Sequence, residues 1–467
     1  MLQVLPLVER NKPVVVNYCD FTCFWDWENF KSFAAETAAV GIIPAYKGFH
    51  PHTLGTTNYA YLREQDGWAK DIQEKQPYTD NRMEEYASSG TYYFATGELM
   101  LEAFTATVAQ GLSLNGEYYV SLTYHALFQK KLPVAVYPLQ HFMQWGTPGD
   151  VAEYNEWSTI FKRLLQNDLE QERSGYLVVP MAGLGQRFSR EGYRLTKPLI
   201  PVSGRPMVLQ ATHDLPPARQ ASYVLRADMP ELDSISMQLQ AEYPSALITT
   251  VPAVTEGQAC TALIGLNELA KQLGEETLEQ VTFGACDNGA LYNQQAFQAL
   301  ANDPDVDVIV WGVRQHANAV RHPHMYGWIN AVDNDVKAIS VKFPLEQPEL
   351  DPIVIGTFTF RRSSDFVHAV KSLISRDGRV NGEFYIDSCI NDALALGLKC
   401  KLFEVDNFIS WGTPNDLKTF EYWQSCFHKW TGHPYQLEQD SRVSRTAIAE
   451  LQERYAALVP APLMAKA

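Results

Sequence analysis

The sequence predicts an α/β protein with a mainly parallel, duplicated sheet that helices cover on both faces. Three observations predict this class. Short apolar runs alternate with segments of helical spacing in the second half of the chain. The two halves match each other at an almost constant offset, and a glycine-rich turn follows the first apolar run of the second half.

The internal repeat consists of five short blocks that occur in the same order in both halves. Each block in the second half lies 266 or 267 residues after its partner. The blocks of the first half are Asn17–Asp20, Asp71–Lys75, Gly90–Phe94, Asn115–Tyr119 and Trp145–Pro148, and those of the second half are Gly284–Asp287, Ala338–Lys342, Gly356–Phe360, Asn381–Tyr385 and Trp411–Pro414. A period this long indicates duplicated domains, because solenoid repeats are about 20 to 50 residues long.

The duplication is unequal. Residues 176–267 of the second copy would map to positions before Met1, so the first copy lacks its opening third. We expect an incomplete domain over residues 1–165, a linker over 166–175, a complete domain over 176–430, and a C-terminal helix with a disordered tail over 431–467. The missing strands leave a sheet edge open, which predicts a partner surface, such as that of a homo-oligomer, or a translation start upstream of Met1.

In the second copy, the predicted strands are short apolar runs, and the predicted helices between them have apolar residues at helical spacing. The strands are Tyr176–Pro180, Ala221–Leu225, Ala246–Val251, Val281–Ala285, Val306–Val313, Val354–Phe360 and Cys400–Val405. The helices are Gly257–Gln272, Gln294–Ala301, Ser363–Ile374 and Phe384–Leu396. Strands that alternate with helices imply a mainly parallel sheet.

Composition excludes several classes of protein. Of 467 residues, 46% are hydrophobic, which is enough for full-sized cores and argues against intrinsic disorder. The 38 basic and 54 acidic residues give a net charge of −16 without a basic run, so no nucleic-acid partner is expected. The chain has no apolar stretch of membrane-span length and no signal peptide, so we expect a cytoplasmic protein without a membrane partner. The seven scattered cysteines are expected to be reduced.

The glycine-rich turn is the clearest chemical signal. The strand Tyr176–Pro180 runs into Gly183 and Gly185, where the absence of side chains lets backbone N–H groups approach an anion. Arg187 can place two donors on phosphate oxygens, and Lys197 adds a second cation. By itself the pattern also fits an ordinary strand-to-helix turn. It lacks the third glycine of the dinucleotide fingerprint, and the chain has no P-loop motif.

Two segments, Met181–Phe188 and Lys197–Met207, resemble the signature of the sugar-1-phosphate nucleotidyltransferases, and residues 176–428 fit the plan of that family. The resemblance implies a Rossmann-like fold of the nucleotidyltransferase type. It also implies that an NTP and a phosphorylated substrate react to give a nucleotide-linked product and pyrophosphate. In the family pattern, the nucleotide contacts Ala182, Gly183, Gly185 and Gly257, and its phosphates contact Arg187 and Lys197.

Asp287 follows the predicted strand Val281–Ala285 and matches the family's metal-binding aspartate. A carboxylate at the carboxyl end of a parallel strand faces the ligand crevice, and Mg²⁺ is usually held by one or two carboxylates together with phosphates and water. The alternative is that Asp287 caps a following helix. We expect Mg²⁺ as the cofactor and Asp287 as its ligand.

The acceptor side is predicted from the same resemblance. Lys342 resembles the family's lysine near the acceptor phosphate, Gly356 and Thr357 its sugar-binding turn, and Glu383 the glutamate that contacts sugar hydroxyls. The alternatives are a solvated strand lysine for Lys342 and a favourable helix-start charge for Glu383. Both residues recur in the first copy, which favours a role beyond solvation.

The chain departs from the family pattern in two respects. Where many members have a second metal-binding aspartate before Thr-Pro, this chain has Gly412, and the first copy has Gly146. Asp387 and Asp406 are the candidate replacements, although neither lies at the family's position. The usual base-reading glutamine is not found before Gly257, so the sequence does not name the base.

Two further motifs have structural interpretations. His50-Pro51-His52 and His322-Pro323-His324 are expected in loops, because no third metal ligand has a clear spacing. Asp333-Asn334-Asp335 has the DxD form of a glycosyltransferase, but its place between two apolar runs predicts a hairpin tip.

The sequence therefore predicts a Mg²⁺-dependent nucleotidyltransferase acting on an NTP and a phosphorylated sugar or related small molecule. Its product is expected to serve the synthesis of a surface polysaccharide such as a capsule. Two alternatives stay open: a catalytically impaired tandem protein that binds nucleotide or sugar, and a nucleotide-sugar glycosyltransferase. The first copy lacks the glycine turn and its cations, so it is expected to be a scaffold or an acceptor-side surface.

Overall fold

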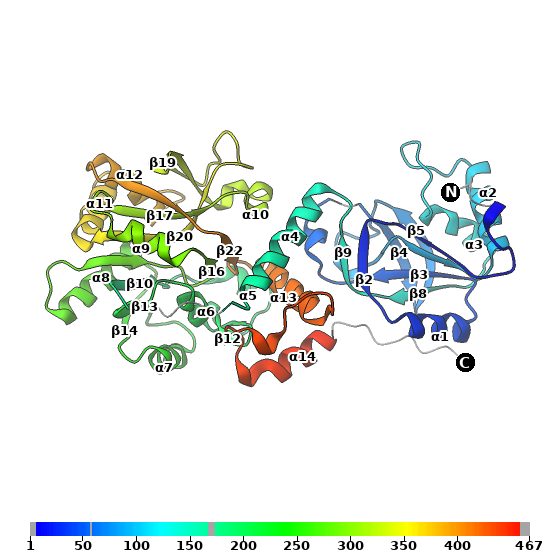
Figure 1. The fold of residues 1–467 in the computed structure, drawn as a ribbon, viewed down its shortest axis with the longest axis horizontal. Coiled ribbons are helices and arrows are strands. Elements are labelled where there is room, and N and C mark those ends of the chain that lie inside the picture. Colours follow the sequence, from blue (N-terminus) through cyan, green and yellow to red (C-terminus); the bar gives the residue numbers. More distant parts are fainter. Residues whose placement is uncertain (1–5, 57, 167–172, 458–467) are drawn as a thin grey trace. The chain divides into compact units, whose positions relative to one another are not determined.

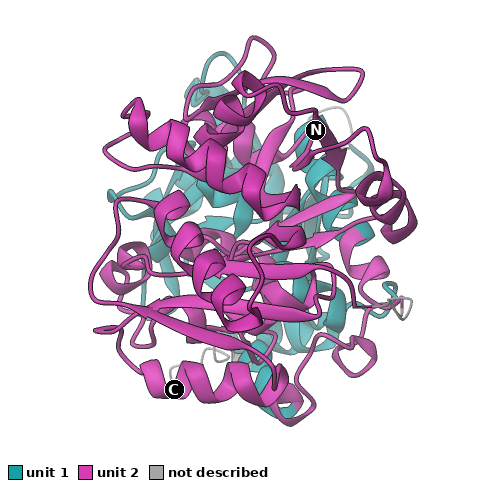
Figure 2. Cartoon of the chain, turned by 90° about the vertical axis from the view of Figure 1, so that its left-hand side faces the viewer, with its two compact units in different colours: residues 1–159, 422–434, 449–467 teal, residues 160–421, 435–448 magenta. Residues whose placement is uncertain are grey.

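The computed structural model describes residues 6–56, 58–166 and 173–457. Most of the predicted linker and the predicted disordered tail beyond residue 457 lie outside the described residues. The chain divides into two compact units (Figure 2). Unit 1 comprises residues 1–159, 422–434 and 449–467, and unit 2 comprises residues 160–421 and 435–448.

Unit 2 is built on a nine-stranded sheet in the order β14-β13-β10-β15-β20-β17-β21-β19-β18 (Figure 1). Its strands are β10 (Tyr176–Pro180), β13 (Gln220–Arg226), β14 (Leu247–Val251), β15 (Glu279–Phe283), β17 (Val308–Val313), β18 (Gly327–Val332), β19 (Asp335–Val341), β20 (Ile353–Arg362) and β21 (Cys400–Glu404). Two short antiparallel pairs join β11 (Pro201–Val202) to β12 (Arg205–Pro206) and β16 (Asn288–Leu291) to β22 (Asn407–Ser410).

The helices of unit 2 lie between these strands. They are α5 (Gln186–Arg190), α6 (Met207–His213), α7 (Leu232–Glu242), α8 (Gln258–Leu273), α9 (Gln294–Asn302), α10 (Ala317–Arg321), α11 (Ser363–Ser375), α12 (Ile386–Ala395) and the first half of α13 (Pro414–Lys429). The α/β class is confirmed, and each strand and helix predicted for the second copy is present within a few residues of its expected bounds.

The strand directions were predicted only in part. β14, β13, β10 and β15 are parallel, but β20 runs antiparallel to both β15 and β17. The chain passes from β17 to β20 through the short helix α10 and the hairpin β18–β19, without the long helical crossover that a parallel connection needs. The sheet is therefore mixed: its first four strands are parallel, β17 and β21 form a second parallel pair, and β20 runs antiparallel between these two groups.

Helix α8 shows how local sequence positions the loops above the sheet. Its buried residues repeat at helical spacing from Ala259 to Leu269. Gly265 lies among them, and a Cβ there would come within 2.4 Å of Val224 on β13. The helix therefore packs closely on the parallel strands and holds the loop between β14 and α8 at their carboxyl ends.

Unit 1 contains a seven-stranded sheet in the order β1-β7-β3-β6-β4-β5-β8. Its strands are β1 (Val14–Asn17), β3 (Gly41–Tyr46), β4 (Ala60–Gln65), β5 (Trp68–Glu74), β6 (Tyr86–Ser88), β7 (Thr91–Phe94) and β8 (Val134–Pro138), and a separate pair joins β2 (Phe21–Phe24) to β9 (Gln140–Gln144). Its helices are α1 (Trp27–Thr37), α2 (Gly97–Ala109), α3 (Tyr124–Gln129), most of α4 (Pro148–Arg163) and α14 (Ile448–Ala457).

The two units pair equivalent strands in equivalent registers. When 266 or 267 is added to the residue numbers of unit 1, the residue pairs that join β3 to β7 and β8 become the pairs that join β17 to β20 and β21. The first two pairs of β2 with β9 likewise match those of β16 with β22, after which β2 has a bulge. Unit 2 continues from β15 to β10, whereas the equivalent strand β1 is the end strand of its sheet. Among the described residues of unit 1, β3 and β8 form the parallel pair, and the rest of the sheet is antiparallel because β10, β13 and β14 have no counterpart there.

The hairpin tip predicted at Asp333-Asn334-Asp335 is confirmed. Asp333 and Asn334 form the tip of the hairpin β18–β19, with left-handed φ angles of 51° and 65°. The part of the chain that the structure describes holds no group of three or more metal-ligating side chains. All seven cysteines are free. Among the described helices, none is long and apolar enough to cross a membrane.

Candidate functional site

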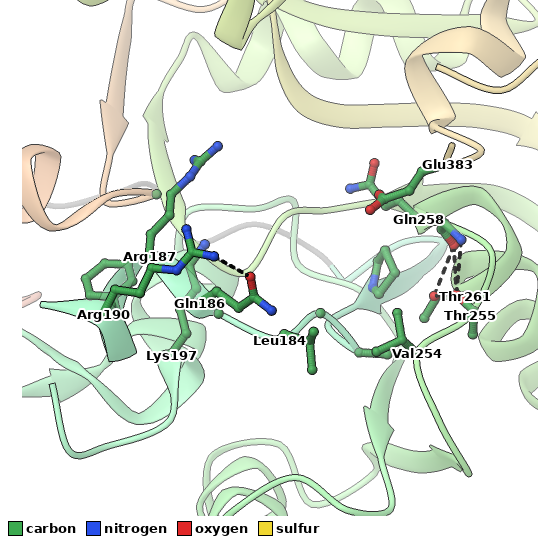
Figure 3. A pocket seen from close by; sticks show the side chains of 17 residues that line it. Leu184, Gln186, Arg187, Arg190, Lys197, Val254, Thr255, Gln258, Thr261 and Glu383 are labelled. Carbon is green, nitrogen blue, oxygen red and sulfur yellow. Dashed lines mark hydrogen bonds between the residues drawn. The ribbon is translucent and has the colours of Figure 1, made fainter. Parts of the chain in front are cut away.

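A cavity of about 640 Å³ in unit 2 brings together loops at the carboxyl ends of the parallel strands (Figure 3). The turn between β10 and α5 contributes Ala182–Phe188, and the loop between β14 and α8 contributes Thr255 and Gly257. Glu383, before α12, and Gly412, before α13, also line the cavity. Ligands of open α/β sheets bind in this position.

Most of the residues singled out in the sequence converge here. Those that line the cavity are Ala182, Gly183, Gly185, Arg187, Lys197, Gly257 and Glu383. Asp287 is linked to the cavity through an ion pair with Lys197. Lys342 interacts electrostatically with Arg187 and Glu383. Gly356, with a φ of 79°, and Thr357, which is 1% exposed, lie on β20 and do not line the cavity.

The glycine turn has its carbonyl groups held away from the cavity. The Arg226 side chain, which is 5% exposed, donates to Ala182 O at 3.0 Å and to Gly183 O at 2.8 Å. Gly185 has a left-handed φ of 62° and begins α5. Within the described residues, the N–H groups of Gly183 and Gly185 donate no hydrogen bond. The turn therefore offers free amide donors to an anion.

Cations outnumber carboxylates on the cavity wall. Arg187, Arg190 and Lys197 line it, with Glu383 as the carboxylate among the lining residues. Figure 3 shows the three cations on one side and Glu383 with Gln258 on the other. One side thus suits a chain of phosphates, and the other suits hydroxyl and ring-nitrogen groups.

Lys197 and Asp287 form an ion pair beside the glycine turn, in which Lys197 Nζ donates to Asp287 Oδ2. Burial acts to lower the pKa of Lys197, but Asp287 and Cys286 together outweigh it, so the pKa lies above its usual value. Asp287 follows β15 and precedes the strand β16. The alternative that Asp287 caps a helix is therefore wrong.

Gly257 connects the two sides of the cavity. It has a φ of 140°, and a Cβ there would lie 2.4 Å from Phe384 N. The Ala259 N–H donates to Phe384 O at 2.9 Å, and the Phe384 N–H donates to Glu256 O at 2.9 Å. A glycine is required because the loop before α8 runs directly against the segment that carries Glu383.

Lys342 is not a solvated strand lysine. Its Nζ donates to Met325 O and lies 5.6 Å from the centre of the Tyr385 ring. Burial lowers the pKa of Lys342, although the Asp387 carboxylate opposes this effect. Burial also raises the pKa of the Asp387 carboxyl group. These residues form a partly enclosed polar cluster near Glu383.

Gly412 leaves one flank of Asp287 open, since a Cβ at Gly412 would lie 3.3 Å from Asp287 Oδ2. Both candidate replacements for the second metal ligand are engaged elsewhere. Asp406 pairs with Arg163 at 2.6 Å, and Asp387 is buried close to Lys342.

The donors present fit a Mg²⁺ site with one protein carboxylate. Asp287 is partly exposed, and bound phosphates would supply most of the other oxygens, as is common for this ion. Asp416 interacts electrostatically with Asp287, but its Oδ2 accepts from the Thr413 N–H at 3.1 Å and from the Thr413 hydroxyl at 2.7 Å. Asp416 thus holds the start of α13.

Sequence reasoning missed Arg190, Gln258 and Arg226. Arg190 lies three residues after Arg187, a spacing that places both on one face of α5 and could have indicated it. Gln258 follows Gly257 directly and begins α8. Arg226 contacts residues that lie 43 and 44 positions before it in the sequence, and the local sequence carries no signal for this contact.

Two solved structures are similar to about half of this chain. The nucleoside-diphosphate-sugar pyrophosphorylase from Vibrio cholerae RC9 is 19% identical at a TM-score of 0.43, over 52% of this chain and 98% of that protein. The inositol-1-phosphate CTP transferase from T. maritima is 13% identical at a TM-score of 0.42, over 54% of this chain and 96% of that protein. By sequence, no family profile and no curated protein matches. We base the function on the cavity and not on these likenesses.

Proposed function

We propose that unit 2 is a nucleotidyltransferase, which joins an NTP to a phosphorylated acceptor such as a sugar 1-phosphate and releases pyrophosphate. The observation that carries this proposal is the cavity in which the glycine turn, three cations and the Lys197–Asp287 pair meet. Backbone amides and cations are the groups that bind phosphates. The opposite wall, with Gln258 and Glu383, suits a base and sugar hydroxyls.

The reaction forms a bond between an acceptor phosphate oxygen and the α-phosphorus of the NTP, and it breaks the bond to pyrophosphate. No general base is required, because the second pKa of a phosphate is about 6 and the attacking oxygen is already ionised. Arg187, Arg190 and the amides of the glycine turn would stabilise the charge on the phosphoryl oxygens. Lys342 and Glu383 would orient the acceptor.

Mg²⁺ bound at this site would neutralise negative charge on the NTP phosphates. Asp287 is the residue that would hold it. Lys197, which pairs with Asp287 in the structure, would then contact the phosphates.

The proposal extends to the whole chain. The shared registers support the interpretation of the units as an incomplete and a complete copy of one ancestral domain. The described residues of unit 1 contain no counterpart of the glycine turn, so we assign the transfer reaction to unit 2. We place the enzyme in the cytoplasm, where its product would supply a surface polysaccharide such as a capsule.

One observation favours a second candidate function. Gly412 removes a carboxylate from the flank of Asp287, which would suit a protein that binds nucleotide and sugar without turnover. The glycosyltransferase alternative is disfavoured, because Asp333 and Asp335 lie at a hairpin tip and are not among the residues that line the cavity.

The test is pyrophosphate release by the full-length protein. ATP, CTP, GTP, UTP and dTTP are each combined with a panel of sugar 1-phosphates and other phosphorylated acceptors, with and without Mg²⁺. We expect Mg²⁺-dependent release with one nucleotide–acceptor pair. NTP binding without release from any pair would favour the second candidate function.

Two variants test the residue roles. Arg187→Ala should lower turnover by about two to three orders of magnitude, as the loss of one strong transition-state donor does. Asp287→Asn should shift the Mg²⁺ titration to higher concentrations. Turnover of Arg187→Ala near the wild-type rate, or an unchanged titration for Asp287→Asn, would contradict the assignment. Arg10→Met is the matched control, since Arg10 forms an exposed ion pair in unit 1.

A further inference from the structure

Unit 1 has a cavity of its own, about 390 Å³ in volume, lined by residues of β2, β4, β5, β7 and β9 and of their adjoining loops. The volume lies within the roughly 300–1,000 Å³ that is typical of small-molecule sites. The proposed transfer reaction does not use this cavity. We propose that it binds a sugar ring that carries at most one phosphate group.

Aromatic rings form much of the wall. Tyr18, Phe21, Tyr59, Tyr92 and Phe142 all line the cavity. Phe21 and Phe142 pack with ring centres 5.2 Å apart, and Tyr18 and Tyr92 are 6.2 Å apart. Tyr18 is 37% exposed, so part of its side chain is accessible. Such rings can pack against the C–H face of a sugar while their hydroxyl groups remain available for hydrogen bonds.

The cavity wall carries both hydroxyl groups and side chains with hydrogen-bond-accepting oxygens. Asp20, Glu74, Asn58 and Gln144 carry carboxylate or amide oxygens that line it. Gln144 Oε1 is buried and has no hydrogen-bond partner among the described residues, while Gln144 Nε2 donates to Asp150 at 2.5 Å. The Gln144 side chain is therefore held in place at the cavity wall by Asp150.

The charges of the cavity exclude a nucleoside triphosphate. Lys75 is the cation among its lining residues, against the carboxylates Asp20 and Glu74. Lys75 Nζ donates to Tyr119 OH at 2.7 Å and lies 4.8 Å from the centre of that ring. One ammonium group can accept one phosphate, but it cannot offset three. This is the reverse of the unit 2 cavity, where three cations face one carboxylate.

The backbone around this cavity repeats that of unit 2. A Cβ at Gly146 would lie 3.1 Å from Asp20 Oδ2, as one at Gly412 would lie 3.3 Å from Asp287 Oδ2. Lys75 has a φ of 57°, close to the 66° of its counterpart in unit 2. Unit 1 thus keeps this framework without the glycine turn, so its ligand is held without contacts to a nucleotide.

Ligand-observed NMR and calorimetry on the full-length protein test the proposal. The probes are glucose, galactose, mannose and N-acetylglucosamine, each free and as the 1-phosphate, together with inorganic phosphate and ATP. The measurements are made in a background that carries Lys342→Met, because this substitution removes a cation from the acceptor side of unit 2. We expect at least one sugar probe to bind saturably in that background. Comparison of each free sugar with its 1-phosphate decides whether Lys75 binds a phosphate group.

Matched variants locate the site. Asp20→Asn and Tyr18→Ala should each weaken sugar binding about 10-fold or more, the loss expected for a charge-assisted hydrogen bond or an aromatic platform. Asp287→Asn, the counterpart of Asp20→Asn in unit 2, should change it less than about twofold. Asp20→Asn keeps the shape of the side chain, so it remains informative if Tyr18→Ala unfolds. Three results would each overturn the proposal: no sugar probe binds, inorganic phosphate competes as well as the sugar phosphate, or binding is lost in Asp287→Asn and kept in Asp20→Asn.

Discussion

Gly183 and Gly257 line the same cavity but leave very different room for a side chain. A Cβ at Gly257 would meet the Phe384 backbone, whereas no atom lies within 4 Å of a Cβ at Gly183. We expect Gly257→Ala to destabilise unit 2 by at least about 1–3 kcal/mol, the cost of the unfavourable φ alone. Gly183→Ala should change the free energy of unfolding by less than about 0.5 kcal/mol and weaken NTP binding instead, because its methyl group enters the cavity.

Urea denaturation and calorimetric titration with ATP separate these effects. The pair is its own control, since both variants add one methyl group. Loss of stability in Gly183→Ala, or wild-type stability in Gly257→Ala, would contradict the described backbone.

His316 makes the stability of unit 2 depend on pH. Both of its ring nitrogens are buried and have no hydrogen-bond partner among the described residues. Burial lowers the pKa of His316 to about 4. The unfolded chain, with a pKa of about 6.5, binds a proton that the native state does not, so stability is lost as the pH falls from about 6.5 to about 4. The loss amounts to about 3 kcal/mol at the lower pH.

We expect His316→Phe to flatten this pH dependence and to raise stability at pH 7 by about 1 kcal/mol, because it removes unpaired polar atoms and keeps an aromatic ring beside Phe408. Urea denaturation at pH 7, 5.5 and 4.5 measures both effects. His368→Gln is the control, since His368 is exposed. A slope equal to that of the wild type between pH 6.5 and 4.5 would contradict this account.

Single residues of the site were predictable where their chemistry depends on neighbours in sequence. The glycine turn, Arg187 and Lys197 follow a strand within one short segment, so their convergence could be read from spacing. The pairing of Lys197 with Asp287 joins residues 90 positions apart, and the contact of Gly257 with Phe384 depends on the path of two loops. Neither contact has a local signature.

At the scale of the element, β13 supports the glycine turn through its last residue. Arg226 holds the carbonyls of Ala182 and Gly183. We expect Arg226→Met to weaken ATP binding about 10-fold or more and to destabilise unit 2 by about 1–3 kcal/mol, because the buried Ala182 O and the partly buried Gly183 O lose a charged donor. Calorimetric titration and urea denaturation measure these changes. Arg10→Met should alter neither; if Arg226→Met behaves in the same way, the turn does not depend on β13.

The positions of the strands were predictable from the sequence, but the directions of some strands were not. Apolar runs bounded by turns mark strands in either direction. The inference of a parallel sheet requires a helical crossover between successive strands, and it held for β10, β13, β14 and β15. It failed at β20, which runs antiparallel to its neighbours. The segment before β20 forms a hairpin. The sequence shows the length of this hairpin, but the direction it gives to β20 depends on the whole sheet.

At the scale of the whole molecule, unit 1 is built from three separate parts of the chain. Residues 422–434 and 449–467 belong with residues 1–159. Tyr422 OH donates to Phe142 O at 2.5 Å, and Gln140 Nε2 donates to Tyr455 O at 2.9 Å. Repeats and spacing describe each copy along the chain, so they give no indication that the C-terminal segment completes the first unit.

This arrangement predicts that the first copy does not fold when it is expressed alone. A fragment of residues 1–165 lacks Tyr422 and Tyr455, so it exposes apolar surface and leaves Phe142 O and Gln140 Nε2 without their partners. We expect this fragment to show no cooperative thermal transition and a weak near-UV circular dichroism signal. Co-expression with residues 173–467 should restore both signals and yield a complex that purifies with a tag on either fragment. A cooperative transition of the isolated fragment, at the temperature of the first transition of the full chain, would show that residues 1–159 form a unit without the C-terminal segments.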